Sequence, residues 1–359
     1  MTRVDQVLPR LAVRDAIGAH VLHAQQALRD AGFDSDVYAA EWDGDSADRV
    51  RPIDDYVDDE RSWLMYHASV GSHVGNWFAA RRSAKLVDYH NVTPHEFFDA
   101  WAPEISGLLV RGRHQLDDIA PFVRGGIADS HFNELELQRA GCADTAVVPV
   151  MVDVARGAAR VDERLRDQLR ATKRGADWVF VGRVAPNKAQ HELLKAFALY
   201  RRRFDANARL WIVGGESSAH YRVALEQFIA GAGLDDAASL VGSVGDAELG
   251  AYYDAADVFV CASAHEGFCV PVLEAMAHGV PVVARASTAV PETVGDAGVL
   301  VPEDAPAIEM AAAVWKVVSD PQLGDALVTA GQRRVEHFSL PHTRQRFLDA
   351  VTALLDRGA

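Results

Sequence analysis

The chain has 359 residues, of which 49% are hydrophobic and 24% charged, a composition typical of a folded protein with about two α/β domains. Its formal net charge of −15 argues against a nucleic-acid partner, because binding to a phosphate backbone needs a basic surface. The three cysteines form no Cys-x-x-Cys pair, the N-terminal residues do not have the pattern of a signal peptide, and no apolar run approaches the roughly 20 residues of a membrane span. We therefore expect a cytoplasmic protein with reduced thiols.

Short apolar runs alternate with helical patterns along residues 1–155, which predicts a parallel sheet with helices on both faces. A helix is expected over residues 16–31, because Gly32 is a stop signal. Residues 43–60 are acidic and irregular, and we interpret Asp43-Gly44-Asp45 within them as a solvated loop rather than a metal-binding motif. The expected strands of this first domain are residues 4–11, 36–40, 64–67, 86–89, 126–129 and 146–150.

A loop with one glycine, residues 14–18, separates the first predicted strand from the first predicted helix. Gly18 allows the backbone to approach a bound phosphate closely, because it carries no side chain. Asp15 is equally suited to an ordinary N-cap of the helix, so a simple capped helix start is the alternative.

Two histidines of the first domain lie at the ends of predicted strands: His67 ends the third strand and His90 follows the fourth. Parallel α/β sheets bind ligands at the carboxyl ends of their strands, so we expect both histidines and Asn91 to line a ligand cleft. The alternative for a single histidine is a polar residue with satisfied hydrogen bonds. His90 and His95 are five positions apart without a third ligand nearby in sequence, so we expect no metal site.

Residues 77–85 are basic and amphipathic within an acidic protein. This pattern is compatible with a helix at the domain surface and with peripheral contact to an anionic membrane, and we favour the surface helix.

A charged segment of helical character, residues 151–173, is expected to join the first domain to a second α/β domain. Residues 191–204 and 342–355 carry apolar side chains at helical spacing, and we predict a helix in each range. The expected strands of the second domain are residues 178–182, 210–213, 239–241, 258–263, 280–284 and 299–301.

Two cations follow the first strand of this second domain. Arg183 and Lys188 lie five positions apart in Gly182-Arg183-Val184-Ala185-Pro186-Asn187-Lys188. Arginine offers a fork of donors and lysine a mobile charge, so together they suit a diphosphate. Gly215 ends the next strand beside another glycine, and this pair allows close approach of the backbone to a ligand.

Two acids mark the third candidate loop of the second domain. Glu266 and Glu274 lie eight positions apart, the first in a loop after a predicted strand and the second inside the following helix. Free N–H groups and the positive end of the helix dipole favour a phosphate at such a loop. Carboxylates would repel phosphate but accept hydrogen bonds from vicinal hydroxyls, so the pattern predicts a nucleotide sugar as ligand.

The spacing of these acids resembles the Glu-x7-Glu signature of retaining glycosyltransferases of family 4. The resemblance implies that Glu266 contacts hydroxyls of the donor sugar and that Glu274 holds the ribose. It also implies that the amides of Gly267 and Phe268 meet the diphosphate or the sugar. Cys269 stands where the common form of the motif has glycine, so a side chain occupies a usually bare position there.

The same resemblance extends to the cations and to the loops beside them. It implies that Arg183 and Lys188 stabilise the leaving diphosphate and that Val244 contacts the nucleobase through backbone groups. In the first domain it implies that Gly18 lies near the donor phosphates and that His90 lies beside the donor sugar.

This family has the GT-B fold, so the resemblance implies two Rossmann-like doubly wound domains that face a central cleft, near which Ser130 would lie. We expect residues 1–155 to bind the acceptor and residues 156–339 to bind the donor. The C-terminal helix, within residues 340–359, is expected to cross back to the first domain.

The implied activity is retaining transfer of a hexosyl group from a UDP- or GDP-sugar to a hydroxyl of a glycan, lipid-linked or small-molecule acceptor, without a metal cofactor. Two alternatives remain open. A GT-B epimerase or phosphorylase would act without this acceptor chemistry, and a non-catalytic protein would bind the sugar nucleotide only. The sequence does not predict an oligomeric state.

Overall fold

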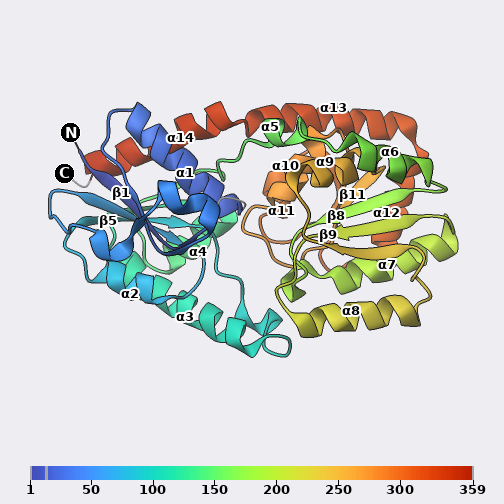
Figure 1. Cartoon of the computed structure of the whole chain (residues 1–359), viewed down its shortest axis with the longest axis horizontal. Coiled ribbons are helices and arrows are strands. Elements are labelled where there is room, and N and C mark those ends of the chain that lie inside the picture. Colours follow the sequence, from blue (N-terminus) through green and yellow to red (C-terminus); the bar gives the residue numbers. More distant parts are fainter. Residues whose placement is uncertain (1, 13–14, 358–359) are drawn as a thin grey trace. The chain divides into compact units, whose positions relative to one another are not determined.

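The structure, a computed structural model, describes residues 2–12 and 15–357 (Figure 1). The chain forms two compact units. The first comprises Met1–Glu96, Pro103–Val152 and Phe338–Ala359, and the second comprises Phe97–Ala102 and Asp153–His337. Among the described residues, no helix has both the length and the apolar character needed to cross a bilayer.

The first unit is built on a seven-stranded sheet in the order β3-β2-β1-β4-β5-β6-β7, and every neighbouring pair is parallel. Its register places Gln6 beside Met65 and His67 beside Asp88. The strands are β1 (Val4–Leu11), β2 (Val37–Trp42), β3 (Arg51–Pro52), β4 (Trp63–Ala68), β5 (Ala84–Tyr89), β6 (Gly125–Ala128) and β7 (Thr145–Val147).

Helices cover both faces of this sheet, with α1 and α14 on one side and α2 and α3 on the other (Figure 1). The last helix of the chain packs into this core, because Phe347, Val351 and Leu354 are buried against strand residues such as Met65 and Ile127. The helices are α1 (Ala16–Asp30), α2 (His73–Ala79), α3 (Pro103–Ile119), α4 (His131–Arg139) and α14 (Leu340–Arg357), with 3-10 turns η1 (Gly44–Arg49), η2 (Ile53–Asp55), η3 (His95–Phe97) and η4 (Ala120–Phe122).

The acidic segment 43–60 is more ordered than predicted. It contains η1, η2 and β3, a short strand at the sheet edge that pairs with β2. Asp43, from the Asp-x-Asp sequence, precedes η1 and accepts a hydrogen bond from the hydroxyl of Ser46. The sequence pattern missed β3 because an edge strand of two residues has no apolar run of its own.

The basic stretch 77–85 does not form the single surface helix that we predicted. The helix α2 ends at Ala79, and residues 84 and 85 already belong to β5. The carboxylate of Asp58 holds the turn between them, because it accepts hydrogen bonds from the backbone N–H groups of Arg82 at 3.0 Å and Ser83 at 3.1 Å. The segment therefore enters the sheet instead of continuing as an amphipathic helix.

The second unit has a six-stranded parallel sheet in the order β10-β9-β8-β11-β12-β13. Trp178 in β8 packs edge-on against Phe197 and Tyr200 of α7 at the centre of its core. The strands are β8 (Asp177–Val181), β9 (Arg209–Val213), β10 (Ala238–Gly242), β11 (Val258–Cys261), β12 (Val282–Arg285) and β13 (Gly298–Val301).

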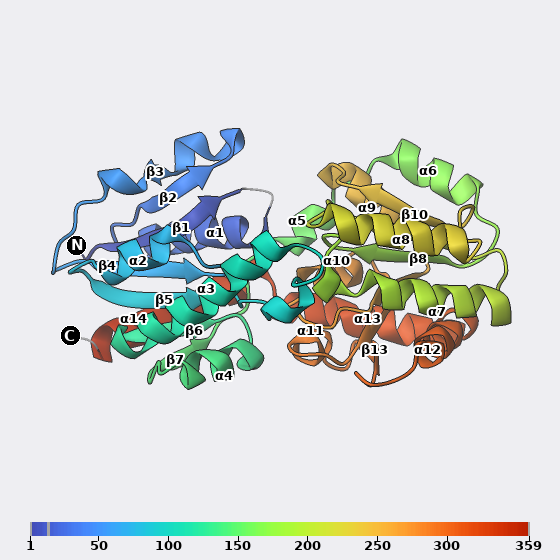
Figure 2. The same ribbon diagram turned by 90° about the horizontal axis from the view of Figure 1, so that it is seen from below.

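Helices lie on both faces of the second sheet as well, with α7, α8 and α12 on one side and α9 and α10 on the other (Figures 1 and 2). The helices of this unit are α5 (Val154–Ala158), α6 (Glu163–Ala171), α7 (Gln190–Arg203), α8 (Ala219–Gly231), α9 (Asp246–Ala255), α10 (Val270–Ala277), α11 (Val290–Val294), α12 (Ala307–Ser319) and α13 (Pro321–His337), with the 3-10 turn η5 (Pro186–Lys188).

One short segment of the N-terminal half, residues 97–102, groups with the second unit. The ring of Trp101 packs edge-on against Tyr221 at 5.2 Å, and its carbonyl accepts a hydrogen bond from the Ser218 hydroxyl at 2.7 Å. Local sequence patterns do not predict this grouping, since Ser218 and Tyr221 follow Trp101 by more than a hundred residues.

Candidate functional site

The order of the second sheet reverses at β8, whose neighbours are β9 and β11. The loops after β8 and β11 therefore leave the sheet side by side, at the position where doubly wound sheets bind their ligands. The first loop carries Arg183 and Lys188, and the second carries Glu266 and Cys269. The strand order thus brings together two motifs that are about eighty residues apart in the chain.

Lys188 and Glu266 form an ion pair across these two loops. The Lys188 Nζ lies 2.7 Å and 2.6 Å from the two carboxylate oxygens of Glu266. Burial alone would lower the pKa of Lys188, but the charge and the hydrogen bonds of Glu266 outweigh burial and raise this pKa. The side chains are only 19% and 8% exposed, so the pair is largely shielded from water.

Backbone contacts hold both loops in place around this pair. The carbonyl of Asn187 accepts hydrogen bonds from the N–H groups of Ala264 at 2.9 Å and His265 at 3.3 Å. The Thr288 hydroxyl accepts a hydrogen bond from the N–H of Glu266 at 2.9 Å and donates one to its carbonyl at 2.8 Å. The position of Glu266 is therefore set by its own backbone and does not depend on Lys188 alone.

The Arg183 side chain is exposed beside this pair, and its positive charge acts on Lys188. Among the described residues, none forms an ion pair with its guanidinium, whereas its backbone carbonyl is fixed by a hydrogen bond from the Gln190 side chain at 2.8 Å. The cation is thus anchored at its backbone and available at its side chain for an anionic ligand.

The start of α10 adds a further positive feature to the loop. This helix has no side-chain cap and no acidic residue in its first turn, so its N-terminal N–H groups and dipole are not neutralised locally. Gly267 and Phe268, which we predicted to offer amides to the ligand, immediately precede this helix start.

Cys269, at the N-cap of α10, adopts the left-handed conformation with φ 82°. This backbone favours glycine, the residue that the resemblance implies at this position, and costs about 1–2 kcal/mol for a residue with a side chain. The Cys269 thiol is buried, with its sulfur 3.9 Å from that of Cys261 at the end of β11.

Glu274 lies inside α10, and its carboxylate accepts a hydrogen bond from the Tyr253 hydroxyl at 2.9 Å. Burial raises the pKa of Glu274, and the hydrogen bond from Tyr253 offsets this only in part. Tyr253 stacks in turn on the ring of His278 with a centroid distance of 5.0 Å. The Glu274 carboxylate is therefore held on the side of α10 that faces α9.

The loop after β9 packs against the loops after β8 and β10. The carbonyl of Gly215 accepts a hydrogen bond from the Val184 N–H at 2.8 Å. A side chain at Gly215 would meet the Ser243 hydroxyl at 2.6 Å, so the bare backbone is needed for this close contact. Val244, the predicted nucleobase contact, is half-buried in the loop that follows.

The predicted histidines of the first unit belong to a buried hydrogen-bonded chain. His90 Nδ1 lies 3.0 Å from the Asp129 carboxylate, and His90 Nε2 lies 2.9 Å from His67 Nδ1. His67 Nε2 lies 2.9 Å from the side-chain oxygen of Gln6. Both ring nitrogens of His90 are therefore engaged, and a direct contact from either nitrogen to a sugar would require one of these bonds to break.

Two further residues complete this cluster. Asp88 is fully buried between the histidines, and one of its oxygens lies 2.9 Å from His20 Nε2. Sequence reasoning missed Gln6, Asp88, Asp129 and His20, although Gln6 and Asp88 are polar residues inside otherwise apolar strands, which is a signal of a buried polar site.

The charges of this cluster follow from its burial. Burial acts to lower the pKa of His90, but the carboxylates of Asp129 and Asp88 raise it to about 9. Burial lowers the pKa of His67 well below its usual value, because the nearby Asp88 compensates only in part. In the protein alone, His90 is therefore the protonated imidazole, and it donates to both Asp129 and His67.

Asn91 and Ser130, which we predicted to lie near the cleft, hold α4 in the structure. The Asn91 side chain, on a backbone with φ 73°, donates hydrogen bonds to Asn133 and Glu136, each at 2.9 Å. Ser130 is the N-cap of α4 and accepts a hydrogen bond from the Asn133 N–H at 3.2 Å. Any contact of these residues with a ligand remains a prediction.

Gly18 lies in the first turn of α1 rather than in a loop. A side chain there would come within 1.9 Å of the Ala12 carbonyl oxygen, so the glycine allows α1 to start directly against the end of β1. Asp15 is the N-cap residue, but its side chain makes no capping hydrogen bond. Residue 14 of the predicted loop lies outside the described residues.

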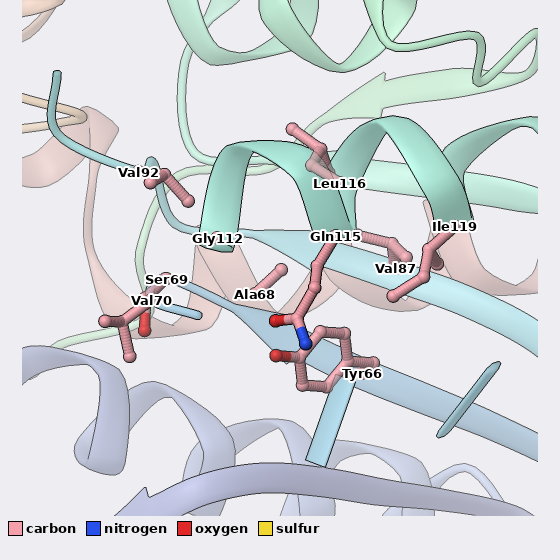
Figure 3. Close-up of a pocket in the computed structure, with 10 residues that line it drawn as sticks. All are labelled: Tyr66, Ala68, Ser69, Val70, Val87, Val92, Gly112, Gln115, Leu116 and Ile119. Carbon is pink, nitrogen blue, oxygen red and sulfur yellow. The ribbon is translucent and has the colours of Figure 1, made fainter. Parts of the chain in front are cut away.

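A small pocket of the first unit, between β4, β5 and α3, is lined mainly by apolar side chains (Figure 3). Its main polar group, the Gln115 amide, already donates hydrogen bonds to the Ser72 carbonyl at 2.6 Å and to Asn76 at 2.8 Å. The lining includes none of the predicted site residues, so we assign no chemistry to this pocket.

Comparison with known proteins agrees with the geometry of the second unit. Residues 175–320, which contain the loops after β8 and β11, match the family model described as Glycosyl transferases group 1. This segment belongs to the group 1 glycosyltransferases. Arg183, Lys188, Glu266 and Glu274 all lie inside the matched segment.

Curated relatives with the names of glycosyltransferases agree with this assignment. The chain is 31% identical to the D-inositol 3-phosphate glycosyltransferase of Kineococcus radiotolerans over 278 residues, which are 72% of this chain and 63% of that protein. It is 36% identical to the O-antigen chain mannosyltransferase B of Escherichia coli over 115 residues, which are 32% of this chain and 30% of that protein. The chain thus spans less than two thirds of the length of these relatives.

Two solved structures share the whole fold of this chain. Sucrose-phosphate synthase from Thermosynechococcus elongatus is similar with a TM-score of 0.78 at 20% identity, over 99% of this chain and 100% of that one. HepE from Anabaena, solved in complex with UDP-glucose, is similar with a TM-score of 0.76 at 16% identity, over 98% and 99% of the two chains. The chain therefore has the GT-B fold.

Proposed function

We propose that this protein is a retaining glycosyltransferase that transfers a hexosyl group from a UDP- or GDP-sugar to a hydroxyl-bearing acceptor. One observation carries the proposal: the ion pair between Lys188 and Glu266 stands beside the exposed Arg183 and the uncapped start of α10. A diphosphate needs the cations and the helix start, and a sugar needs a carboxylate. This arrangement offers both within one short stretch of the second unit.

In the proposed complex the diphosphate lies at the N-terminus of α10, between Arg183 and Lys188. Helix N–H groups and two cations are the groups that neutralise a diphosphate without a metal ion. Glu266 accepts hydrogen bonds from sugar hydroxyls, and Glu274 accepts them from the ribose. Gly215 and Val244 approach the nucleotide from the neighbouring loops, and the Gly215 carbonyl accepts a hydrogen bond from the Val184 N–H.

Donor binding changes the partner of Lys188. Without donor, its ammonium is held by both oxygens of Glu266. A diphosphate carries more negative charge than one carboxylate, so it attracts the lysine and leaves Glu266 oxygens available for sugar hydroxyls. The ion pair therefore keeps both groups charged and in place until the donor arrives.

The transfer step follows from these positions. The bond between the anomeric carbon and the diphosphate oxygen breaks, and a bond from the anomeric carbon to the acceptor oxygen forms on the same face. The acceptor proton passes to the leaving diphosphate, so no protein base is needed. Arg183 and Lys188 stabilise the growing negative charge of the leaving group, and this stabilisation is largest in the transition state.

The acceptor is proposed to be a small or lipid-linked molecule with a free hydroxyl. The names of two relatives, a D-inositol 3-phosphate glycosyltransferase and an O-antigen chain mannosyltransferase, motivate cyclitol phosphates and glycans as first candidates. Similarity in fold to a protein solved with UDP-glucose makes UDP-sugars the first donors to test.

The test is a panel of UDP- and GDP-sugars in a thermal-shift assay, followed by measurement of nucleoside diphosphate release with and without candidate acceptors. We expect one nucleotide class to raise the melting temperature, slow donor hydrolysis alone, and an anomeric configuration that is retained in the product. Added Mg²⁺ should leave the rate unchanged. Binding without turnover would indicate a sugar-nucleotide binding protein, and an isomerised sugar without acceptor would indicate an epimerase.

A further inference from the structure

Three groups of the first unit point their ligand atoms at one another from neighbouring strands. These groups are His67 at the end of β4, His90 after β5 and Asp88 in β5. Together with His20, their ligand atoms lie within 4.8 Å of one another. The four residues are all buried. All four residues belong to the first unit, so the inference does not rest on the donor loops of the second unit.

The outer hydrogen bonds determine which ring nitrogens face inward as acceptors. The Gln6 side-chain oxygen accepts from His67 Nε2–H at 2.9 Å, which leaves a lone pair on His67 Nδ1. The Asp129 carboxylate accepts from His90 Nδ1–H at 3.0 Å, which leaves a lone pair on His90 Nε2. These two lone pairs face each other at 2.9 Å, so a positive group, either a proton or a metal ion, must lie between them.

His20 has a different part in the cluster. The backbone N–H of Met151 donates to His20 Nδ1 at 3.0 Å, so the proton of this ring is on Nε2. His20 Nε2–H donates to one oxygen of Asp88 at 2.9 Å and orients the carboxylate. The other Asp88 oxygen is buried without a hydrogen-bond partner, and it lies 3.8 Å from His90 Nε2.

We propose that His67, His90 and Asp88 bind one divalent transition-metal ion, for which Zn²⁺ is the best match in ligand type. A tetrahedral zinc ion with bonds of about 2.0–2.1 Å separates its ligand atoms by about 3.3 Å. The observed separations are 2.9 Å between the two imidazole nitrogens, 3.6 Å from His67 Nδ1 to one Asp88 oxygen and 3.8 Å from His90 Nε2 to the other. When the ion replaces the proton between the rings, the two nitrogens must move apart by about 0.4 Å.

The surrounding contacts are those of a metal site. Histidines that bind a metal usually donate the outer N–H to a carboxylate or carbonyl oxygen, as His90 does to Asp129 and His67 does to Gln6. Our expectation of no metal was based on the spacing of His90 and His95, whereas the ligands come together only through the pairing of β4 with β5.

A second group of possible ligands, Cys261, Glu266 and Cys269, does not support the same inference. The Lys188 ammonium already occupies both oxygens of Glu266, and its positive charge would repel a cation. In the first unit, by contrast, every described basic group that forms an ion pair with Asp88 is an imidazole, and none is a lysine or an arginine. The His67–His90–Asp88 site joins two adjacent strands, so the ion is expected to stabilise the first unit.

The test is metal analysis of full-length protein that has been expressed with added Zn²⁺ and purified without a metal-affinity step. We expect about one zinc ion per chain in the wild type and less than about a tenth of that in Asp88→Asn, which keeps the shape of the side chain. His73→Gln is the matched control, since this histidine is exposed in the same unit, and it should leave the zinc content unchanged.

A second measurement does not depend on the folding of a variant. Wild-type protein that has been stripped with a chelator is titrated with Co²⁺, and visible ligand-field absorption that saturates at about one equivalent supports the site. The proposal is overturned if folded wild-type protein, shown by circular dichroism, binds neither Zn²⁺ nor Co²⁺ on reconstitution. It is also overturned if Asp88→Asn folds and keeps its ion. Either result would mean that a proton alone links the two rings.

Discussion

Replacing Lys188 with methionine should affect both the structural and the catalytic role of the ion pair. Methionine keeps much of the apolar stem but removes the ammonium that lies 2.6–2.7 Å from both oxygens of Glu266. The Glu266 side chain is only 8% exposed, so its charge would be left without a partner and with little access to water. Both stability and activity should therefore fall, for different reasons.

The structure gives a magnitude for each loss. Breaking a buried ion pair costs about 3–5 kcal/mol, and the 19% exposure of Lys188 places the expected loss of unfolding free energy nearer about 2–3 kcal/mol. Loss of one charged group that stabilises the leaving diphosphate should lower kcat by roughly 10²–10³-fold. The two effects are of similar free energy, so a single variant does not distinguish them.

The double variant Lys188→Met/Glu266→Gln resolves this ambiguity. It removes both charges, so the unfolding free energy should return to within about 1 kcal/mol of the wild type. Activity should stay as low as in Lys188→Met or fall further, because the groups proposed to hold the diphosphate and the sugar are both gone. Urea unfolding measures the stability, and initial rates of nucleoside diphosphate release measure the activity.

Two results would refute this reasoning. Recovery of activity together with stability in the double variant would mean that the pair serves only the fold. Near-normal turnover in Lys188→Met would mean that its ammonium does not act on the leaving group.

Three further predictions concern single positions. Gly18→Ala should destabilise the protein by at least about 2 kcal/mol in urea unfolding, because the new side chain would lie 1.9 Å from the Ala12 carbonyl oxygen. The control is Gly107→Ala, which should be neutral or stabilising because Gly107 has open space around it. Burial raises the pKa of Asp5 from 3.8 to about 6, so its contribution to stability is present below pH 3.8 and is lost as the pH rises through about 6. Between about pH 3 and about pH 7, Asp5→Asn should remove up to about 3 kcal/mol of the change in unfolding free energy with pH. If the unfolding free energy of the variant changes with pH as in the wild type, Asp5 is not the group responsible. Glu274→Gln should raise the donor KM about tenfold with little change in kcat, as expected for a contact made equally in ground and transition states; a large fall in kcat alone would argue against a ribose contact.

Much of the fold was predictable because strands and helices leave local patterns. Apolar runs identified β1, β4 and β5 in the first unit and β8 and β11 in the second, since strands of parallel sheets are buried on both faces. The exceptions were segments whose structure depends on distant partners. The turn after α2, for example, is held by the Asp58 carboxylate, which precedes it by more than twenty residues.

The candidate donor site was predictable in its parts but not in its contacts. Arg183, Lys188, Glu266 and Glu274 stand out in sequence because each charged motif follows an apolar strand. The ion pair between Lys188 and Glu266 was not predictable, because it depends on the adjacency of β8 and β11 in the sheet.

By itself the sequence determined the alternation of strands and helices, the positions of the charged loops and the similarity to a glycosyltransferase family. Only the tertiary structure decided that Gln6, His67, Asp88, His90 and Asp129 form one buried cluster. The physical reason is that periodicity and charge are properties of neighbouring residues, whereas strand order is set by the packing of whole elements. Ligand atoms a few ångströms apart can therefore come from strands that no local pattern connects.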